Sequence, residues 1–207
     1  MDFFPLSSGA TELVLASSSK YRASLLQRLQ IPFSAAAPEV DETPHPDEAP
    51  EPLVQRLAAA KAARIAQAHP TALIIGSDQL AVCDNRLLGK PGTEARAREQ
   101  LATLSGRTVH FHTGLCLLNA ASGHSQVSAV DTPVTFRDLQ PKEIANYVAR
   151  EQPLDCAGAF KSEGLGIALF QAIGGDDPNA LIGLPLIELC TMLAREGLFV
   201  LQQGLPG

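Results

Sequence analysis

Short apolar runs alternate with segments of helical spacing along most of the chain. Residues 12–16 (ELVLA) and 72–76 (ALIIG) are mainly apolar runs of strand length, which are typical of buried strands. Between them, leucines that recur on one helical face predict a helix over residues 20–30. This part of the chain therefore predicts two buried strands with a helix after the first.

The rest of the chain continues this alternation and adds one hairpin. Two extended runs, 109–119 and 124–136, flank Ala121-Ser122-Gly123 and predict a β-hairpin. Asp84-Asn85 predicts a tight turn. Helical patterns cover residues 52–69, 93–104, 141–150 and 180–195. Strands that alternate with helices, together with one long hairpin, predict an α/β fold with a mixed sheet.

The composition fits one globular domain, or one domain with two lobes. The chain has 207 residues, of which 45% are apolar and 18% are charged, so it can bury a sizeable core. The formal net charge of −6 argues against nucleic-acid polymers and anionic membranes as partners. A small anion can still bind through a local cluster of Lys and Arg, usually together with a divalent cation.

Cysteine usage and the lack of targeting signals favour the cytoplasm. The cysteines Cys83, Cys116, Cys156 and Cys190 form no C-x-x-C pair, and we expect reduced thiols. Residues 1–11 lack the basic start and long apolar run of a signal peptide. No stretch approaches the roughly 18 to 20 apolar residues of a membrane span. We therefore expect a cytoplasmic protein without a membrane partner.

Asp78 is the first candidate for chemistry because it closely follows the apolar run 72–76. Ligands of α/β sheets bind at the carboxyl ends of strands, so an acid at this place faces the expected cleft. It can hold a metal ion or accept a proton from water. The alternative is an exposed turn residue that bonds nearby amides, and position alone leaves both interpretations open.

Glu42 lies in residues 38–52, a segment rich in proline and acidic residues. By composition this segment predicts a linker, but a rigid loop at the rim of a cleft also fits its short length. If the loop folds over Asp78, the two carboxylates can share one Mg²⁺ or Mn²⁺, which prefer oxygen ligands. Otherwise Glu42 is an ordinary solvated acid.

Three lysines are candidates for binding an anion. Lys61 falls inside the apolar stripe of its predicted helix, four residues from Leu57 and from Ile65. A lysine on a buried face needs a partner or a cleft, unless its long side chain reaches solvent. Lys90 and Lys161 lie in the glycine-containing segments LGKP and FKSEG, which either present a fixed cation to phosphate or are surface turns.

A run of serines, Ser17-Ser18-Ser19, stands between the first predicted strand and helix. Hydroxyl groups and free amides at the start of a helix can bind an anion. Ser19 can also act as an ordinary N-cap, because its hydroxyl can accept a hydrogen bond from a first-turn amide. The serine run alone does not separate these two interpretations.

These features occur in one order along the chain: S-x-S, V-D-E-T, G-S-D-Q, G-K-P, F-K-S-E-G and G-x-P. Each motif is short, but the ordered set resembles the Maf family of nucleotide pyrophosphatases over about residues 12–195. The G-S-D-Q and F-K-S-E-G motifs together resemble the branch of that family that hydrolyses 7-methyl-GTP. The specificity of the resemblance therefore lies in the series and not in any single motif.

The resemblance implies a mixed α/β fold with two lobes around a central cleft, related to the inosine-triphosphate pyrophosphatases. It implies one domain over residues 12–207, preceded by an N-terminal extension at 1–11 to which we assign no function. Two positions depart from the family. Lys20 stands where the family usually has proline, and Tyr21 stands where the 7-methyl-GTP branch typically has tryptophan. An aromatic ring at this place fits that branch.

The resemblance also assigns roles to single residues. Asp78 corresponds to the general base, and Glu42 and Asp78 correspond to metal-side acids. The positions that distinguish substrate branches are Tyr21, Gln79 and Glu163. The phosphate-side residues are Ser17, Arg22, Lys61, Lys90 and Lys161.

The expected reaction is hydrolysis of a nucleoside triphosphate, foremost 7-methyl-GTP, to the monophosphate and pyrophosphate, as housekeeping of the nucleotide pool. It needs cations on the triphosphate, a divalent metal such as Mg²⁺ or Mn²⁺, and a base that orients water. Two alternatives stay open: a pyrophosphatase for dTTP, UTP or ITP-like substrates, and a nucleotide-binding regulator of cell-division arrest. The expected partner is a small nucleotide, and a homodimer is left open.

Overall fold

The computed structural model describes residues 12–202, so the predicted extension at 1–11 lies outside the described residues. A seven-stranded sheet has the strand order β2-β1-β3-β5-β6-β7, and β4 pairs with β3. The strands are β1 (Leu13–Ala16), β2 (Ser34–Ala36), β3 (Leu73–Cys83), β4 (Arg86–Leu88), β5 (Thr108–Asn119), β6 (Ser125–Phe136) and β7 (Phe170–Ile173). The helices are α1 (Lys20–Gln27), α2 (Pro50–Ala66), α3 (Glu94–Leu104), α4 (Pro141–Glu151) and α5 (Leu186–Arg195).

The sheet contains both kinds of strand pairing. β1 pairs in parallel with β2 and with β3. β3, β5, β6 and β7 follow one another in antiparallel pairs, and β4 returns antiparallel along β3. The predicted α/β fold with a mixed sheet is therefore confirmed. Within residues 12–202, no helix has the length and apolar character that crossing a membrane would need.

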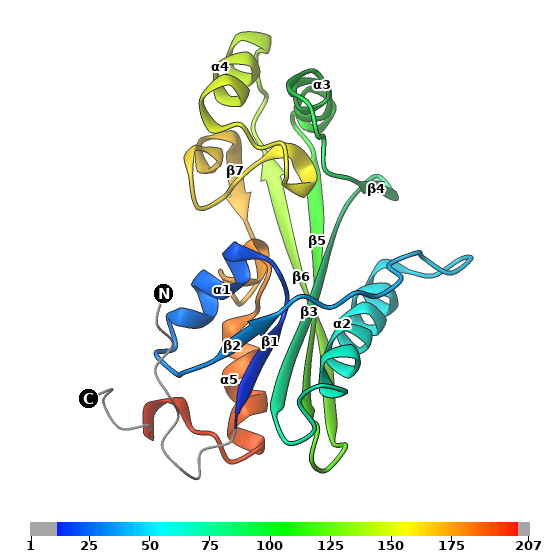
Figure 1. The fold of residues 1–207 in the computed structure, drawn as a ribbon. Helices are drawn as coiled ribbons and strands as arrows, with labels where there is room; N and C mark the ends of the chain where they lie inside the picture. Colours follow the sequence, from blue (N-terminus) through cyan, green and yellow to red (C-terminus); the bar gives the residue numbers. More distant parts are fainter. Residues whose placement is uncertain (1–11, 203–207) are drawn as a thin grey trace.

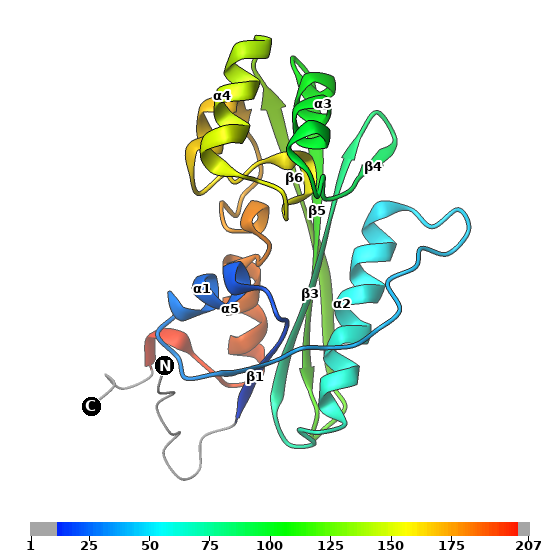
Figure 2. The ribbon, with the colours of Figure 1, turned by 45° about the horizontal axis from the view of Figure 1, so that its top comes forward.

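Two lobes share the long strands β3, β5 and β6, which run through the whole molecule (Figure 1). In the lower lobe, α1 and α5 pack on one face of the sheet and α2 packs on the other. The upper lobe carries α3 and α4, with β4 and β7 beside the long strands (Figure 2). Among the described residues, the upper lobe has one cluster of buried apolar side chains, and the lower lobe has one on each face of the sheet. The domain boundary predicted at 12–207 stays a prediction.

Two glycines allow α2 to lie very close to the sheet. A Cβ atom at Gly76 would lie 2.0 Å from the carbonyl oxygen of Ala58, and one at Gly114 would lie 2.2 Å from that of Val54. No side chain fits at such distances, so glycine on β3 and on β5 determines how deeply α2 packs. Because α2 carries Lys61, this close approach brings that lysine to the middle of β3.

Most predicted elements are present, with ends that differ by a few residues. Ser19 caps α1 by accepting a hydrogen bond from the amide of Arg22 at 3.4 Å, and Thr93 caps α3 in the same way. The predicted turn at Asp84-Asn85 joins β3 to β4, and both residues have positive φ values, 49° and 59°. The predicted hairpin is the β5–β6 pair. The short strands β2, β4 and β7 carry no clear signal in the sequence.

The predicted end of the second strand is wrong. β3 does not stop at residue 76 but continues to Cys83, because β5 pairs with it as far as Val82 and β4 pairs with it up to Cys83. The parallel neighbour β1 leaves after the Ala16–Gly76 pair. Asp78 therefore lies within a strand and not after it. It still lies just beyond the carboxyl end of the parallel pairing, where β1 no longer covers that edge of β3.

The last predicted helix is also shorter than expected. A 3₁₀ turn at Ala180–Ile182 precedes α5, so the helical pattern over 180–195 is interrupted. Gly183 has a φ of 120°, which other residues rarely adopt, and Pro185 precedes the first residue of α5. The G-x-P motif is thus the break between the two segments.

Candidate active site

A cavity of about 610 Å³ lies where the two lobes meet. Its walls come from the start of α1, the middle of β3, the acidic loop before α2 and the loop 155–163 of the upper lobe. α1 and α2 lie on opposite sides of β3 in both views (Figures 1 and 2).

The cavity has two parts, and each part takes its name from one of its residues. The Lys61 side consists of Ser17, Arg22, Glu42, Lys61 and Asp78, and the Tyr21 side consists of Lys20, Tyr21, Asp155, Cys156 and Glu163.

Lys61 bridges the two predicted metal-side acids. Its Nζ lies 2.5 Å from Oδ1 of Asp78 and 2.6 Å from Oε1 of Glu42. Lys61 and Asp78 are only 7% and 8% exposed, whereas the side chain of Glu42 is 60% exposed. Oδ2 of Asp78 has no hydrogen-bond partner among the described residues and is not enclosed. The structure therefore brings Glu42, Lys61 and Asp78 together and leaves one oxygen of Asp78 accessible.

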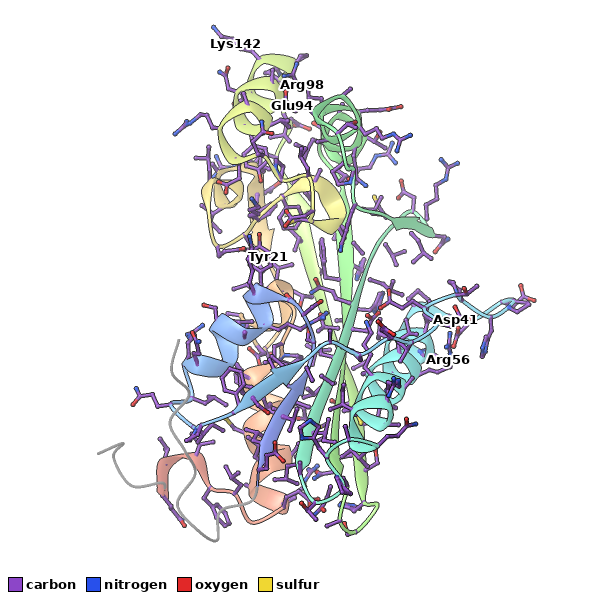
Figure 3. The ribbon with its side chains drawn as sticks, in the orientation of Figure 1. Tyr21, Asp41, Arg56, Glu94, Arg98 and Lys142 are labelled. Carbon is purple, nitrogen blue, oxygen red and sulfur yellow. The ribbon has the colours of Figure 1, made fainter. Side chains whose placement is uncertain are left out.

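The acidic segment is a loop that folds back onto α2, and not a linker. The guanidinium of Arg56 on α2 donates to Glu48 at 2.7 Å and to the carbonyl oxygen of Thr43 at 3.1 Å. Asp41 accepts a hydrogen bond from the amide of Thr43 and lies near Arg56 (Figure 3). The hydrogen bond from Arg56 and one from the amide of His45 lower the pKa of Glu48 to about 2. These contacts hold Glu42 at the rim of the cavity, as one of the two interpretations predicted.

Arg22 is held by groups far away in the sequence. Its Nε donates to the carbonyl oxygen of Gly183 at 2.8 Å, and its Nη1 donates to Oγ of Ser17 at 3.4 Å. Ser77 donates to the same carbonyl oxygen at 3.0 Å. Burial lowers the pKa of Arg22, and the negative charges of Asp78 and Glu42 oppose that effect. The guanidinium therefore lies in the electrostatic field of the Lys61 cluster.

The two loop lysines differ in position. Lys90 lines the cavity, is exposed, and has no ion-pair or hydrogen-bond partner in the described part of the chain. Lys161 lies outside the cavity wall, and its Nζ donates to the carbonyl oxygens of Glu151 and Gln152 at 3.0 and 3.5 Å. These carbonyls end α4, where a cation is favourable. Lys90 thus lies at the cavity, and its phosphate role stays a prediction, whereas the geometry gives the phosphate role of Lys161 no support.

Tyr21 faces the upper lobe across the cavity. Figure 3 shows its side chain pointing from the start of α1 toward the loop that contains Asp155 and Glu163. Partial burial, together with the neighbouring Cys156, Asp155 and Glu163, raises the pKa of Tyr21 to about 12. The ammonium of Lys20 lies 5.1 Å from the centre of the tyrosine ring. The structure thus brings the predicted Tyr21 and Glu163 to one side of the cavity.

Gln79 lines the cavity but is also fixed by its amide. Its Nε2 donates to Oγ1 of Thr113 at 2.9 Å and to the carbonyl oxygens of Ala180 and Leu181 at 2.9 and 3.1 Å. Carbonyl oxygens accept and do not donate, so they determine which end of the amide faces them. The oxygen of Gln79 is left without a partner and is not enclosed. Gln79 can therefore offer a ligand an acceptor but not a donor.

On the upper wall, Phe111, Asp155 and Cys156 carry no functional signal in the sequence, whereas Phe160 begins the F-K-S-E-G motif. The rings of Phe111 and Phe160 meet edge to face, with centres 5.2 Å apart, and give the wall an apolar base. Burial, together with the charge of Asp155, raises the pKa of Cys156 to about 12. The thiol therefore stays protonated near neutral pH and is a poor nucleophile.

Glu42 and Asp78 are the groups that could hold a metal ion. The described residues contain no group of three or more His, Cys, Asp or Glu side chains suited to an ion. Each of the two carboxylates gives one oxygen to Lys61, which leaves its other oxygen available. Mg²⁺ usually takes one or two protein carboxylates and completes its shell with water and substrate phosphates. The pair therefore fits a metal that arrives with a triphosphate.

The sequence matches the family described as Maf-like protein over residues 12–196. A 7-methyl-GTP pyrophosphatase of Nitrosococcus oceani is 56% identical over 189 residues, which are 91% of this chain and 95% of that protein. These findings confirm the resemblance drawn from the ordered motifs.

Two solved structures share the fold. One is a HAM1 protein from Coxiella burnetii, with a TM-score of 0.52 and 17% identity over 90% of this chain and 100% of that chain. The other is the Ham1 protein of Staphylococcus aureus, with a TM-score of 0.50 and 13% identity over the same shares of the two chains. At such identities the likeness shows a common architecture and no more.

Proposed function

The chain belongs to the Maf family, and from this premise we propose that it hydrolyses 7-methyl-GTP to 7-methyl-GMP and pyrophosphate. One observation carries the proposal: a cavity has a buried lysine–carboxylate cluster on one side and an aromatic, acidic wall on the other. The first side suits the charged triphosphate, and the second suits a positively charged purine. The 56% identity to a 7-methyl-GTP pyrophosphatase supports the same substrate.

The reaction adds one water molecule across the bond between the α- and β-phosphates. The water oxygen forms a new bond to phosphorus, the P–O–P bridge breaks, and pyrophosphate leaves with the bridging oxygen. We assign Asp78 as the base, because its Oδ1 is held by Lys61 while its Oδ2 is accessible. The proton of water therefore goes to Oδ2 of a carboxylate whose position is fixed.

Three cations are placed to offset the charge of the triphosphate. Lys90 is unpaired and exposed at the cavity wall, so it can turn toward phosphate oxygens. Arg22 is held through Nε and Nη1, which leaves Nη2 and a second hydrogen on Nη1 to donate. Lys61 keeps the two acids from repelling the substrate. Positioning and charge neutralisation of this kind supply most of the catalysis in phosphoryl transfer.

A divalent cation held by Glu42 and Asp78 would neutralise phosphate oxygens and make a bound water more acidic. Glu42 has one oxygen that Lys61 does not use, and Oδ1 of Asp78 keeps a second lone pair beside the lysine, so both acids could contact an ion while Oδ2 of Asp78 stays free for the proton. Mg²⁺ and Mn²⁺ prefer such oxygen ligands.

The residues that we assign to recognition of the base are Tyr21, Gln79 and Glu163. Guanine presents N–H donors on its Watson–Crick edge, and the free oxygen of Gln79 and the carboxylate of Glu163 are acceptors. Methylation gives the purine a positive charge, and the ring face of Tyr21 can stack on it. Stacking of a cation on an aromatic ring contributes on the order of 1 to 2 kcal/mol when water is excluded.

The test is pyrophosphate release from 7-methyl-GTP, GTP, ITP, dTTP and UTP with Mg²⁺ or Mn²⁺. We expect the highest kcat/KM for 7-methyl-GTP. A higher value for dTTP, UTP or ITP would replace this substrate with one of the family's other nucleotides. Tight binding of a nucleotide with no turnover would favour the regulator of cell-division arrest instead.

The proposal includes a cytoplasmic place of action, because the expected substrate belongs to the free nucleotide pool. Its partner is then a small nucleotide and neither a nucleic-acid polymer nor a membrane. A homodimer stays a prediction, which sedimentation of the purified protein at several concentrations would decide.

A further inference from the structure

Two carboxylates on the Tyr21 side have no cation partner among the described residues. Asp155 is exposed, and the one hydrogen bond of its carboxylate to a described residue comes from the thiol of Cys156, whose sulfur lies 3.5 Å from Oδ1. Glu163 is exposed and has the hydroxyl of Ser162 at 3.4 Å. Lys161, the nearest lysine in the sequence, is turned away to the end of α4. Both negative charges are therefore available to a ligand in the cavity.

A cation already lies at this place. The ammonium of Lys20 lies 5.1 Å from the ring centre of Tyr21, and it has no carboxylate within ion-pair distance in the described structure. Tyr21, in turn, lies close enough to Asp155 and Glu163 for their charges to disfavour its ionisation. The ring, the two carboxylates and the ammonium thus form one neighbourhood that is favourable for positive charge.

We propose that Asp155 is a specificity-determining residue, which selects a positively charged purine over its neutral counterpart. The inference rests on the proposed function and extends it to a residue with no sequence signal. Glu163 and Gln79 accept hydrogen bonds from the base edge, which guanine presents whether or not it is methylated. Asp155 interacts with the charge of the ring system, which only the methylated base carries. The ammonium of Lys20 is the resident cation, and the base displaces it from the ring of Tyr21.

The effect is expected to depend on charge and not on shape. Asp155 makes no backbone hydrogen bond and no ion pair with a described residue, so its removal leaves no buried group unpaired. A carboxylate near a cation at an exposed site changes affinity by up to about fivefold. Both nucleotides carry the same triphosphate, so the ratio of their kcat/KM values cancels every contribution of the Lys61 side.

The experiment compares the wild-type protein with Asp155→Asn on 7-methyl-GTP and on GTP. We expect the ratio of kcat/KM values to fall about 2- to 5-fold, with GTP hydrolysis unchanged within about 1.5-fold. Asp155→Glu, which keeps the charge, should retain most of the wild-type ratio. Asp176→Asn is the matched control: Asp176 is exposed, lies outside the cavity wall, and its loss changes the net charge equally. It should leave the ratio unchanged.

The affinity for the monophosphate product gives a second readout, which does not depend on the hydrolysis step. Calorimetry with 7-methyl-GMP and GMP should show the same fall in the ratio of dissociation constants for Asp155→Asn. If the wild-type protein prefers 7-methyl-GTP and Asp155→Asn leaves the ratio between the two nucleotides unchanged, the inference about Asp155 is overturned while the proposed function stands. An equal loss on both nucleotides would overturn it too, and would assign Asp155 to the phosphates. A wild-type protein that prefers GTP would instead overturn the proposed function, and this inference with it.

Discussion

The two sides of the cavity are built in opposite ways. On the Lys61 side, partners come from distant parts of the chain: Arg22 bonds to Gly183, and Lys61 on α2 bridges the loop residue Glu42 and the strand residue Asp78. On the Tyr21 side, the hydrogen bonds and ring contacts of the charged side chains join sequence neighbours, such as Lys20 with Tyr21 and Asp155 with Cys156.

This difference matches the demands of the two tasks. Every triphosphate presents the same phosphates, so the groups that act on them benefit from fixed positions held by several elements. The base differs between substrates, and a wall of exposed and half-buried side chains at the start of α1 and on one loop can change without disturbing the fold. Changes on the Lys61 side should therefore affect all nucleotides equally, whereas changes on the Tyr21 side should affect them selectively.

The largest expected effect is on the Lys61 side. Asp78→Asn should lower kcat by about 10²- to 10⁴-fold, because it removes the base and one of the metal-side charges. The loss should be the same for 7-methyl-GTP and GTP. Both rates are measured by pyrophosphate release, with circular dichroism to show that the protein is folded. Near-normal turnover in a folded variant would end the assignment.

Removal of the metal should separate activity from stability. Chelation with EDTA should lower turnover of every nucleotide at least about 100-fold, since the metal supplies several kcal/mol of charge stabilisation. The melting temperature should hardly change, because Lys61 already forms an ion pair with each of the two acids in the metal-free protein. Full activity in excess EDTA would contradict the metal dependence of turnover. Unfolding in EDTA would contradict the expected constant melting temperature.

Lys61→Met tests the same cluster through stability. It removes the cation from Asp78, which is buried, and should destabilise the protein by about 3 kcal/mol. Urea unfolding measures the change. The matched variant is Lys90→Met, which removes an exposed, unpaired lysine and should cost less than about 0.5 kcal/mol. Equal effects of the two variants would show that the buried bridge does not stabilise the fold.

A smaller and selective effect is expected on the Tyr21 side. Glu163→Gln keeps the size of the side chain and removes its charge, and should lower kcat/KM for 7-methyl-GTP about tenfold. The value for a pyrimidine triphosphate such as UTP should change little. Steady-state rates on both substrates and both proteins decide the point. A uniform loss would move Glu163 to the phosphates or the metal.

The smallest effect concerns the loop that carries Glu42. Arg56 and the amide of His45 lower the pKa of Glu48 to about 2, below its ordinary value of 4.5. A lowered pKa stabilises the folded state above the ordinary value, and this contribution is lost as the pH falls toward 2. Glu48→Gln should therefore be slightly less stable than wild type at pH 6 and equally stable near pH 2. A stability difference that stays constant with pH would exclude the ion pair as its cause.

The sequence predicts the Lys61 side better than the Tyr21 side, for a physical reason. Lys61 interrupts an apolar stripe, and that local pattern was enough to predict its burial. Asp78 lies at the cavity, but β3 continues past it because pairing with β5, a tertiary interaction, overrides the polar residues. Asp155 and Cys156 line the cavity only because the upper lobe folds over α1. No local sequence pattern predicts this packing. Lys161 is part of a recognisable motif, yet nearby helix carbonyls bind its ammonium.

The unbroken strands β3, β5 and β6 have a mechanical consequence. They cross from one lobe to the other without a joint, so a rotation of the lobes would bend three hydrogen-bonded strands at once (Figure 2). Large closure of the hinge type is therefore costly in this architecture. The parts that can adjust to a bound molecule are the two loops at the rim of the cavity, one around Glu42 and one around Asp155. Free and bound forms should then differ mainly in these two loops, while the distance between the lobes stays nearly constant.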